Sequence, residues 1–237
     1  MRIAMWSGPR NLSTAMMYAF AQRADCAVWD EPFYAAYLKV TGIDHPMRDE
    51  ILAAGETDPN DVAEACIGPI PQGKSLFYQK HMAQHMVAGM PLDWADRVTN
   101  VFLIRHPAYV VASYAKKREA PVEEDLGFVR LAELFDRLGG DAPIVVDSAD
   151  IRRAPVAMLQ KLCTRLGIDY DPAMTRWPAG GNPADGVWSP HWYGAIHAST
   201  GFSKMEGDPP ELTGDYARLV EEAMPHYLRM ADAAMTL

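Results

Sequence analysis

Short apolar runs alternate along most of the chain with segments whose apolar residues recur at helical spacing. The runs at residues 3–6, 26–29, 75–79, 98–104 and 143–146 predict five strands. Helical spacing follows the first run and recurs over the following segments: residues 108–117, 126–138, 155–166 and 213–230. Strands that alternate with helices favour a parallel sheet covered on both faces. We therefore predict a three-layer α/β fold with a central parallel sheet of about five strands.

Two long stretches interrupt this alternation. Residues 41–73 hold many Gly, Pro and Asp residues around two expected short helices, and residues 176–212 are rich in aromatic residues, Gly and Pro. We predict a single domain over residues 1–237, in which these two stretches form the substrate or lid regions. Ligands in open parallel sheets bind beyond the carboxyl ends of the strands.

Composition and charge narrow the possible partners. The chain has 237 residues, 49% of them hydrophobic, and a formal net charge of −9, so its overall field repels a polyanion and argues against a nucleic-acid partner. The three cysteines, Cys26, Cys66 and Cys163, show no metal-ligand spacing and are expected to be buried thiols in a reducing compartment. The apolar start is far shorter than the roughly 20 residues of a membrane-spanning helix, so we expect a cytoplasmic protein without a membrane segment.

The turn after the first predicted strand, in the stretch "WSGPRNLSTAMM", is a candidate anion site. A strand that turns directly into a helix aims the backbone N–H groups of the first helical turn at whatever occupies the turn. Arg10 adds a positive charge, and Asn11, Ser13 and Thr14 add short donors; ordinary capping of the helix is the alternative interpretation. A Walker A loop requires Lys where Ser13 stands, so we expect neither a metal ion nor magnesium-dependent phosphoryl transfer.

A second candidate site is the stretch "RHPAYVVAS" after the fourth predicted strand. Arg105 follows the strand, Pro107 suits the first helical position, and Ser113 lies one or two turns into the helix. Arg105 and Ser113 are suited to hold a second phosphate. A surface ion pair of Arg105 is the alternative, and the presence of the first turn favours the phosphate.

These two stretches resemble the signatures of the sulfotransferase family that uses 3′-phosphoadenosine 5′-phosphosulfate (PAPS). The family's first signature, Pro-Lys/Arg-Ser-Gly-Ser/Thr-Thr after a strand, is similar to "GPRNLSTAM". Its second signature, Arg-Asn/Asp-Pro with a later Ser, is similar to "RHPAYVVAS". The resemblance implies a P-loop-type fold, PAPS as donor, a 3′-phosphate held by Arg105 and Ser113, and a 5′-phosphosulfate loop made by Gly8, Pro9, Arg10, Asn11, Leu12, Ser13 and Thr14.

The chain departs from the family pattern at three places. Asn11 and Leu12 stand where the family has Ser-Gly, which bears on how closely the backbone wraps the 5′ group. Tyr109 stands where cytosolic members often have Asp. The stretch "NPADGVWSPHW" is similar to the Arg-Lys-Gly-x-x-Gly-Asp-Trp cap of cytosolic members but lacks the Arg-Lys-Gly, which predicts one contact fewer to the 3′-phosphate.

Sulfuryl transfer to a hydroxyl needs a base for the acceptor's proton and a cation for the leaving phosphate. Arg10 suits the second role. Glu31, after the second strand, resembles the catalytic Glu of bacterial and Golgi-type members, and His81 is similar to the His of the cytosolic Lys-Thr-His; we favour Glu31. Lys80 either assists the bridging oxygen or is merely solvated, while Glu31 and His81 have structural alternatives as a helix-start carboxylate and a polar residue at a strand end.

The aromatic segment with Trp188, His191, Trp192, Tyr193 and His197 is predicted either to wall an acceptor pocket or to pack as a lid on the sheet. The favoured function is transfer of a sulfuryl group to a hydroxyl or amine of a small molecule. Two alternatives stay open: a P-loop kinase-like phosphotransferase, and a nucleotide-binding protein that keeps the fold without transfer.

Overall fold

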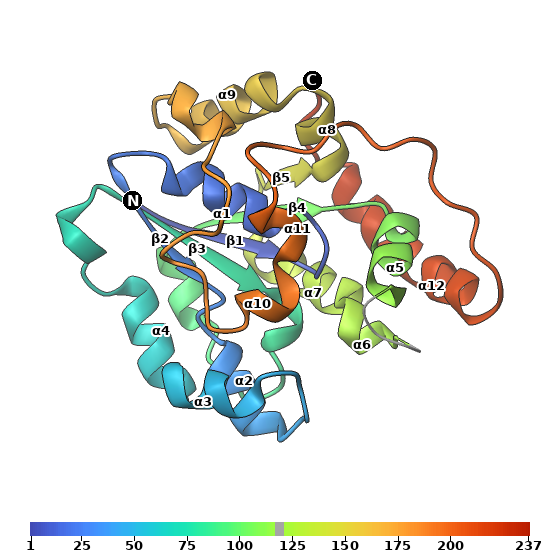
Figure 1. The fold of residues 1–237 in the computed structure, drawn as a ribbon, viewed down its shortest axis with the longest axis horizontal. Coiled ribbons are helices and arrows are strands. Elements are labelled where there is room, and N and C mark those ends of the chain that lie inside the picture. The colour runs from blue at the N-terminus through green and yellow to red at the C-terminus, as the bar shows by residue number, and fades with distance from the viewer. Residues whose placement is uncertain (117–120) are drawn as a thin grey trace.

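A five-stranded, all-parallel sheet forms the centre of the protein (Figure 1). The structure is a computed structural model, and it describes residues 1–116 and 121–237. The strand order is β2-β3-β1-β4-β5. The strands are β1 (Arg2–Ser7), β2 (Cys26–Asp30), β3 (Leu76–Met82), β4 (Thr99–Ile104) and β5 (Ile144–Asp147). The predicted α/β class and the five predicted strands are thus confirmed.

Helices connect the strands and cover both faces of the sheet. Their bounds are α1 (Ser13–Ala21), α2 (Tyr34–Thr41), α3 (Arg48–Ala54), α4 (Pro59–Ile67), α5 (Pro107–Ala115), α6 (Glu123–Leu126), α7 (Phe128–Leu138), α8 (Ser148–Arg153), α9 (Pro155–Leu166), α10 (Ser189–Trp192), α11 (Gly194–His197) and α12 (Gly214–Ala231). The helix predicted over 108–117 corresponds to α5, and its predicted last residue lies outside the described residues. The helix predicted over 126–138 is divided by Gly127, whose φ of 67° ends α6 and begins α7. The excursion at 41–73 contains α3 and α4, as expected.

Alternating side chains of the strands build two core layers. Ile3 and Met5 of β1 pack with α1, α8 and α9 on one face of the sheet. Ala4 and Trp6 pack with α4, α7 and α12 on the other. All four side chains are fully buried, and burial of one large apolar side chain contributes about 1.5–3 kcal/mol. These two layers fix the sheet and thereby the edge at which the strands end.

The strand order places the predicted site residues at one edge. β1 lies between β3 and β4, so the loop that follows β1 is adjacent to the loop that follows β4. The chain leaves β1 toward β2 and leaves β4 toward β5, in opposite directions along the sheet. A crevice forms at such a reversal of direction, beyond the carboxyl ends of the strands.

Candidate functional site

The loop between β1 and α1 adopts left-handed backbone conformations without glycine. Arg10 has a φ of 63°, and Leu12, the residue before α1, has a φ of 73° and a ψ of 9°. Each such conformation costs a non-glycine residue about 1–2 kcal/mol. The buried Asn11 fixes the loop from inside, because its Nδ2 donates to the carbonyl of Leu103 at 3.3 Å. The substitutions of Asn11 and Leu12 for the family's Ser-Gly therefore do not prevent the tight turn.

Gly8 of the same loop has a packing role. A Cβ at this position would lie 2.7 Å from the carbonyl oxygen of Leu126. The absence of a side chain thus lets the loop lie against the end of α6. Gly8 is not among the residues that line the cavity described below.

Arg10, Arg105 and Arg152 gather beyond the carboxyl ends of β1, β4 and β5. Arg10 Nε donates to Ser113 Oγ at 2.9 Å, and Arg105 Nη1 donates to the carbonyl of Arg10. Both Arg105 and Arg152 face the carboxylate of Glu206: Arg105 binds it through two nitrogens, and Arg152 Nε lies 3.6 Å from Glu206 Oε2. The structure thus brings Arg10, Arg105 and Ser113 together, as predicted, and adds Arg152 and Glu206.

Burial and the repulsion between the neighbouring guanidinium groups favour a negative charge in this cluster. Burial lowers the pKa of Arg10, and the positive charge of Arg105 lowers it further. Burial also lowers the pKa of Arg152; Glu206 opposes the shift, and Arg105 reinforces it. The three arginines outnumber the carboxylate that pairs with them. An anion bound there gains charge-assisted hydrogen bonds from the arginines, although the chain as a whole carries a negative net charge.

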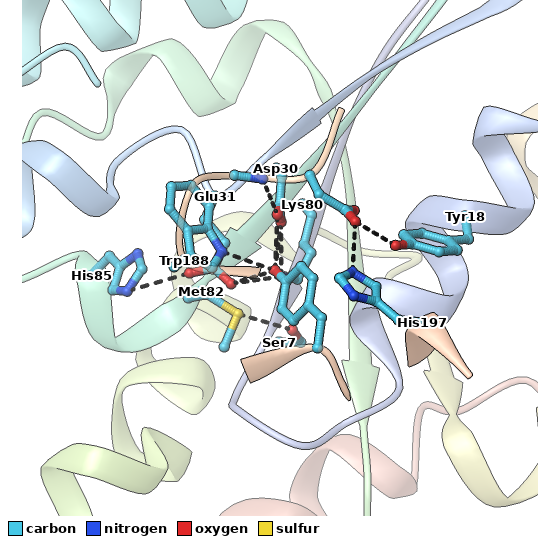
Figure 2. Close-up of polar contacts among 12 residues, drawn as sticks. Ser7, Tyr18, Asp30, Glu31, Lys80, Met82, His85, Trp188 and His197 are labelled. Carbon is cyan, nitrogen blue, oxygen red and sulfur yellow. Dashed lines mark hydrogen bonds and ion pairs between the residues drawn. The ribbon is translucent and has the colours of Figure 1, made fainter. Parts of the chain in front are cut away.

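A buried network occupies the ends of β2 and β3. Lys80 Nζ donates to Asp30 Oδ1 at 2.9 Å, to Glu31 Oε1 at 2.6 Å and to the hydroxyl of Tyr193 at 2.6 Å (Figure 2). These three acceptors use the three N–H groups of the ammonium. Burial lowers the pKa of Lys80, but Asp30 and Glu31 raise it by more, so the side chain stays charged. In this arrangement Lys80 holds the carboxylates in place.

The aromatic segment is tied to this network. The Tyr193 hydroxyl donates to Asp30 and accepts from Trp188 Nε1 at 3.1 Å, while the backbone N–H of Gly186 donates to Asp30 Oδ2 at 3.1 Å. Trp192 and Tyr193 line the cavity, whereas Trp188 packs beneath them. Both predicted roles of the segment, pocket wall and packed lid, thus have residues that suit them.

The predicted cap lies elsewhere. Residues 182–192, which contain the stretch similar to the family's cap, are anchored at the end of β2 and not at Arg105. Residues 203–207 lie at Arg105 in their place: Ser203 Oγ accepts from Arg152, and the carbonyl of Gly207 accepts from Tyr109. Asp30 accounts for this position of the stretch, because its buried carboxylate binds Gly186 and Tyr193.

The two predicted histidines of the aromatic segment contact other residues of the same segment. His191 stacks edgewise on Trp192, and His197 binds Asp185.

One cavity of about 330 Å³ joins the arginine cluster to the Lys80 network. Residues from the loop after β1 and from the ends of the other strands line it. They include Pro9, Arg10, Asn11, Leu12, Ser13, Thr14, Glu31, Lys80, His85, Arg105, Ser113 and Arg152. Most predicted site residues therefore share one cavity, with a positive cluster at one end and carboxylates at the other.

His81 does not reach this cavity. It follows Lys80 on β3, and successive side chains of a strand point to opposite faces. His81 stacks on Trp6 with 4.6 Å between ring centroids, in the core layer on the other side of the sheet. Burial and the neighbouring His85 lower its pKa to about 3. The structure thus keeps Glu31 and not His81 beside the cavity.

Sequence reasoning missed several residues of the cavity and of the arginine cluster, among them His85, Arg152 and Glu206. Arg152 follows the fifth strand by one helical turn, so the argument used for Ser113 applies to it as well. His85 ends a 3-10 helix of three residues after β3, and Glu206 lies outside regular secondary structure. No periodicity marks either position.

The described residues contain neither a metal-binding cluster nor a membrane-spanning helix. No group of three or more His, Cys, Asp or Glu side chains in residues 1–116 and 121–237 is arranged to hold a metal ion. Within the same ranges, no helix has the length and apolar character needed to cross a membrane.

The comparison with family models identifies one family for nearly the whole chain. A family model described as "Sulfotransferase domain" matches residues 1–234. Two curated relatives from Arabidopsis thaliana are each 38% identical over 95% of this chain. They are "Branched-chain-amino-acid aminotransferase-like protein 2" and "Branched-chain-amino-acid aminotransferase-like protein 1". The chain spans about 40% of the length of these relatives.

Solved sulfotransferase structures share the fold. The sulfotransferase domain from the curacin biosynthetic pathway has a TM-score of 0.56 at 14% identity, and covers 94% of this chain and 96% of its own. The sulfotransferase domain from the Synechococcus PCC 7002 olefin synthase has a TM-score of 0.56 at 16% identity, with 94% of each chain covered. Mouse sulfotransferase SULT7A1, complexed with PAP, has a TM-score of 0.50 at 14% identity, with 96% of this chain and 84% of its own covered.

Proposed function

The chain belongs to the sulfotransferase domain family, and on that basis we propose that it transfers a sulfuryl group from PAPS to a hydroxyl or amine of a small molecule. The observation that carries the proposal is the single cavity that joins three arginines to a buried Glu31–Lys80 pair. A donor with two separate anionic groups needs two sets of donors, and the loop after β1 and the Arg105 cluster supply them. The PAP bound to the mouse structure supports the choice of donor.

The proposed arrangement of the donor follows from the charges. The 3′-phosphate would lie beside Arg105, Ser113 and Arg152, where the Glu206 carboxylate already makes the contacts of an anion. The 5′-phosphosulfate would lie on the loop after β1, where the first N–H groups of α1 favour negative charge. Residues 41–73 and 176–212 would form the other walls, since His45 and Trp192 line the cavity.

The proposed reaction is an in-line displacement at sulfur. The acceptor oxygen forms a bond to sulfur while the bond from sulfur to the 5′-phosphate oxygen breaks, which releases adenosine 3′,5′-bisphosphate. Glu31 takes the acceptor's proton, Lys80 holds Glu31 in position, and Arg10 with the loop N–H groups stabilises the charge on the leaving phosphate. This assignment needs no metal ion in the transfer step.

Calorimetry with adenosine 3′,5′-bisphosphate in the absence of magnesium tests the donor. Binding under these conditions supports the proposal. Binding of ATP with magnesium, and not of the bisphosphate, would instead indicate a kinase-like phosphotransferase. Binding of the bisphosphate without turnover of PAPS, with any acceptor or with water, would indicate a nucleotide-binding protein that keeps the fold.

A further inference from the structure

A buried histidine borders the cavity next to Glu31. His85 is 4% exposed, and its ring lies between Tyr34 and Tyr37, with centroid distances of 4.6 and 4.8 Å and interplanar angles of 17° and 21°. Tyr34 is the first residue of α2, and Tyr37 lies one turn further along the same helix. The two tyrosine rings stacked on the imidazole cover its faces. Only the edge of the ring remains to contact a ligand in the cavity.

The polar atoms of this edge are incompletely used. His85 Nε2 lies 3.8 Å from Glu31 Oε2, beyond hydrogen-bond distance (Figure 2). His85 Nδ1 is buried and has no hydrogen-bond partner among the described residues. Glu31 Oε1 is different, because Lys80 Nζ donates to it at 2.6 Å. His85 Nε2 and Glu31 Oε2 therefore lie side by side at the cavity, close enough for one ligand atom to contact both.

The charges around the ring decide which nitrogen carries the proton. Burial holds the pKa of His85 well below its usual value, and the neighbouring His45 and Lys80 lower it further, so the imidazole is neutral. A lone pair on Nε2 would face the Glu31 carboxylate and be repelled by it. The neutral ring therefore places its N–H on Nε2 and its lone pair on Nδ1.

We propose that His85 and Glu31 together bind the acceptor and select a hydroxyl over an amine, an inference that rests on the proposed function. A hydroxyl oxygen in the cavity beside these two atoms, within hydrogen-bond distance of each, accepts from His85 Nε2 and donates to Glu31 Oε2. An ammonium group, the form of an aliphatic amine at neutral pH, has no lone pair to accept that bond.

The transfer step balances with these two residues. The hydroxyl oxygen attacks sulfur, its O–H proton passes to Glu31 Oε2, and the sulfur–oxygen bond to the 5′-phosphate breaks. The products are the sulfate ester and adenosine 3′,5′-bisphosphate, and the proton on Glu31 returns to solvent. His85 keeps its own proton throughout and touches the reacting oxygen.

Three variants distinguish the contribution of the His85 nitrogen atoms from that of ring packing. His85→Phe keeps a ring between the two tyrosines and removes both nitrogens, while His85→Gln places an amide N–H near the position of Nε2. His81→Phe is the matched control, because it makes the same change in a buried histidine that faces away from the cavity. Calorimetry with adenosine 3′,5′-bisphosphate on each variant checks that the donor site is intact.

Benzyl alcohol and benzylamine, which differ only in the reacting group, serve as acceptors with radiolabelled PAPS. We expect the wild-type protein to sulfate the alcohol at least about tenfold faster, and His85→Phe to lower kcat/KM for the alcohol about tenfold or more. His85→Gln should recover part of this loss. His81→Phe should have the same kcat/KM for the alcohol as the wild-type protein. Affinity for the bisphosphate should stay within about twofold in all variants.

Retention of wild-type kcat/KM by His85→Phe, or preference for the amine, overturns the inference and leaves the proposed function standing. If neither acceptor reacts, release of sulfate from PAPS with water as the hydroxyl is the readout: loss in His85→Phe supports the inference, and retention overturns it. A wild-type protein that binds the bisphosphate but releases no sulfate at all overturns both proposals for transfer. Failure to bind the bisphosphate overturns the donor assignment itself.

Discussion

Replacing Glu206 with Gln is expected to strengthen binding of adenosine 3′,5′-bisphosphate. The Glu206 carboxylate binds Arg105 through two nitrogens and lies 3.6 Å from Arg152 Nε. Under the proposed function, the 3′-phosphate takes these contacts and must displace the carboxylate first. Gln keeps the size of the side chain and removes the charge, so the phosphate meets a weaker competitor.

The size of the effect follows from burial. The side chain of Arg105 is 9% exposed and that of Glu206 is 22% exposed, so the pair lies between an exposed salt bridge of about 0.2–1 kcal/mol and a buried charged hydrogen bond of about 1.5–3 kcal/mol. A value of about 1–2 kcal/mol corresponds to roughly 5- to 30-fold tighter binding. The neutral Gln retains a part of the contact, which makes the lower half of this range the expected one.

Calorimetry with the bisphosphate measures the effect, and Glu211→Gln is the matched control. Glu211 is exposed in the same segment, and its replacement changes the net charge by the same amount. Adenosine 5′-monophosphate, which lacks the 3′-phosphate, should bind both variants as it binds the wild type. Equal affinities of the two variants for the bisphosphate, or weaker binding by Glu206→Gln, would refute competition between Glu206 and the 3′-phosphate.

Three further substitutions probe the remaining parts of the site. Arg105→Ala should weaken bisphosphate binding about 10- to 100-fold in calorimetry, from about 1.5–3 kcal/mol for hydrogen bonds to a charged group; unchanged affinity would contradict the 3′-phosphate assignment. Glu31→Gln should lower kcat about 10²- to 10⁴-fold without loss of bisphosphate affinity, and undiminished turnover would exclude Glu31 as the base. Lys80→Met should destabilise the protein at neutral pH by about 3–5 kcal/mol, because it leaves Asp30 and Glu31 buried without their cation. Burial raises the pKa of Asp30 and Lys80 opposes that rise, so without Lys80 the deficit should shrink as the pH falls toward 4 and Asp30 takes up a proton. Urea denaturation at several pH values measures this, and a deficit that does not change with pH would contradict it.

The sheet could be predicted from the sequence because its strands are buried on both faces. Such strands appear as short, nearly continuous apolar runs, and all five were recognisable in this way. Helices α2 and α8 were not predicted. Each begins just after a strand end and is at most eight residues long, so neither spans enough turns to show a helical period.

The same continuity of β3 concealed which of its side chains face the site. In a strand with one exposed face, polar residues mark that face, but β3 is buried throughout its seven residues. Lys80 and His81 are adjacent, both polar and both buried, so the sequence does not say which one points toward β2's carboxylates. The pairing of Asp30 with Lys80 across the sheet decides it, and this contact spans fifty positions of the chain.

Contacts within the protein hold the loop after β1 in its conformation. Its left-handed residues, Arg10 and Leu12, together cost about 2–4 kcal/mol relative to glycine. Three contacts offset this cost: Leu12 packs against the core layer around α1, Asn11 binds the carbonyl of Leu103, and Arg105 binds the carbonyl of Arg10. The last contact also orients Arg105 toward the cluster, so the two proposed phosphate subsites are formed as one unit. A ligand that meets a preformed loop loses little free energy to reordering the chain. Under the proposed function, a few fixed groups thereby offset the repulsion between a chain of net charge −9 and a polyanionic donor.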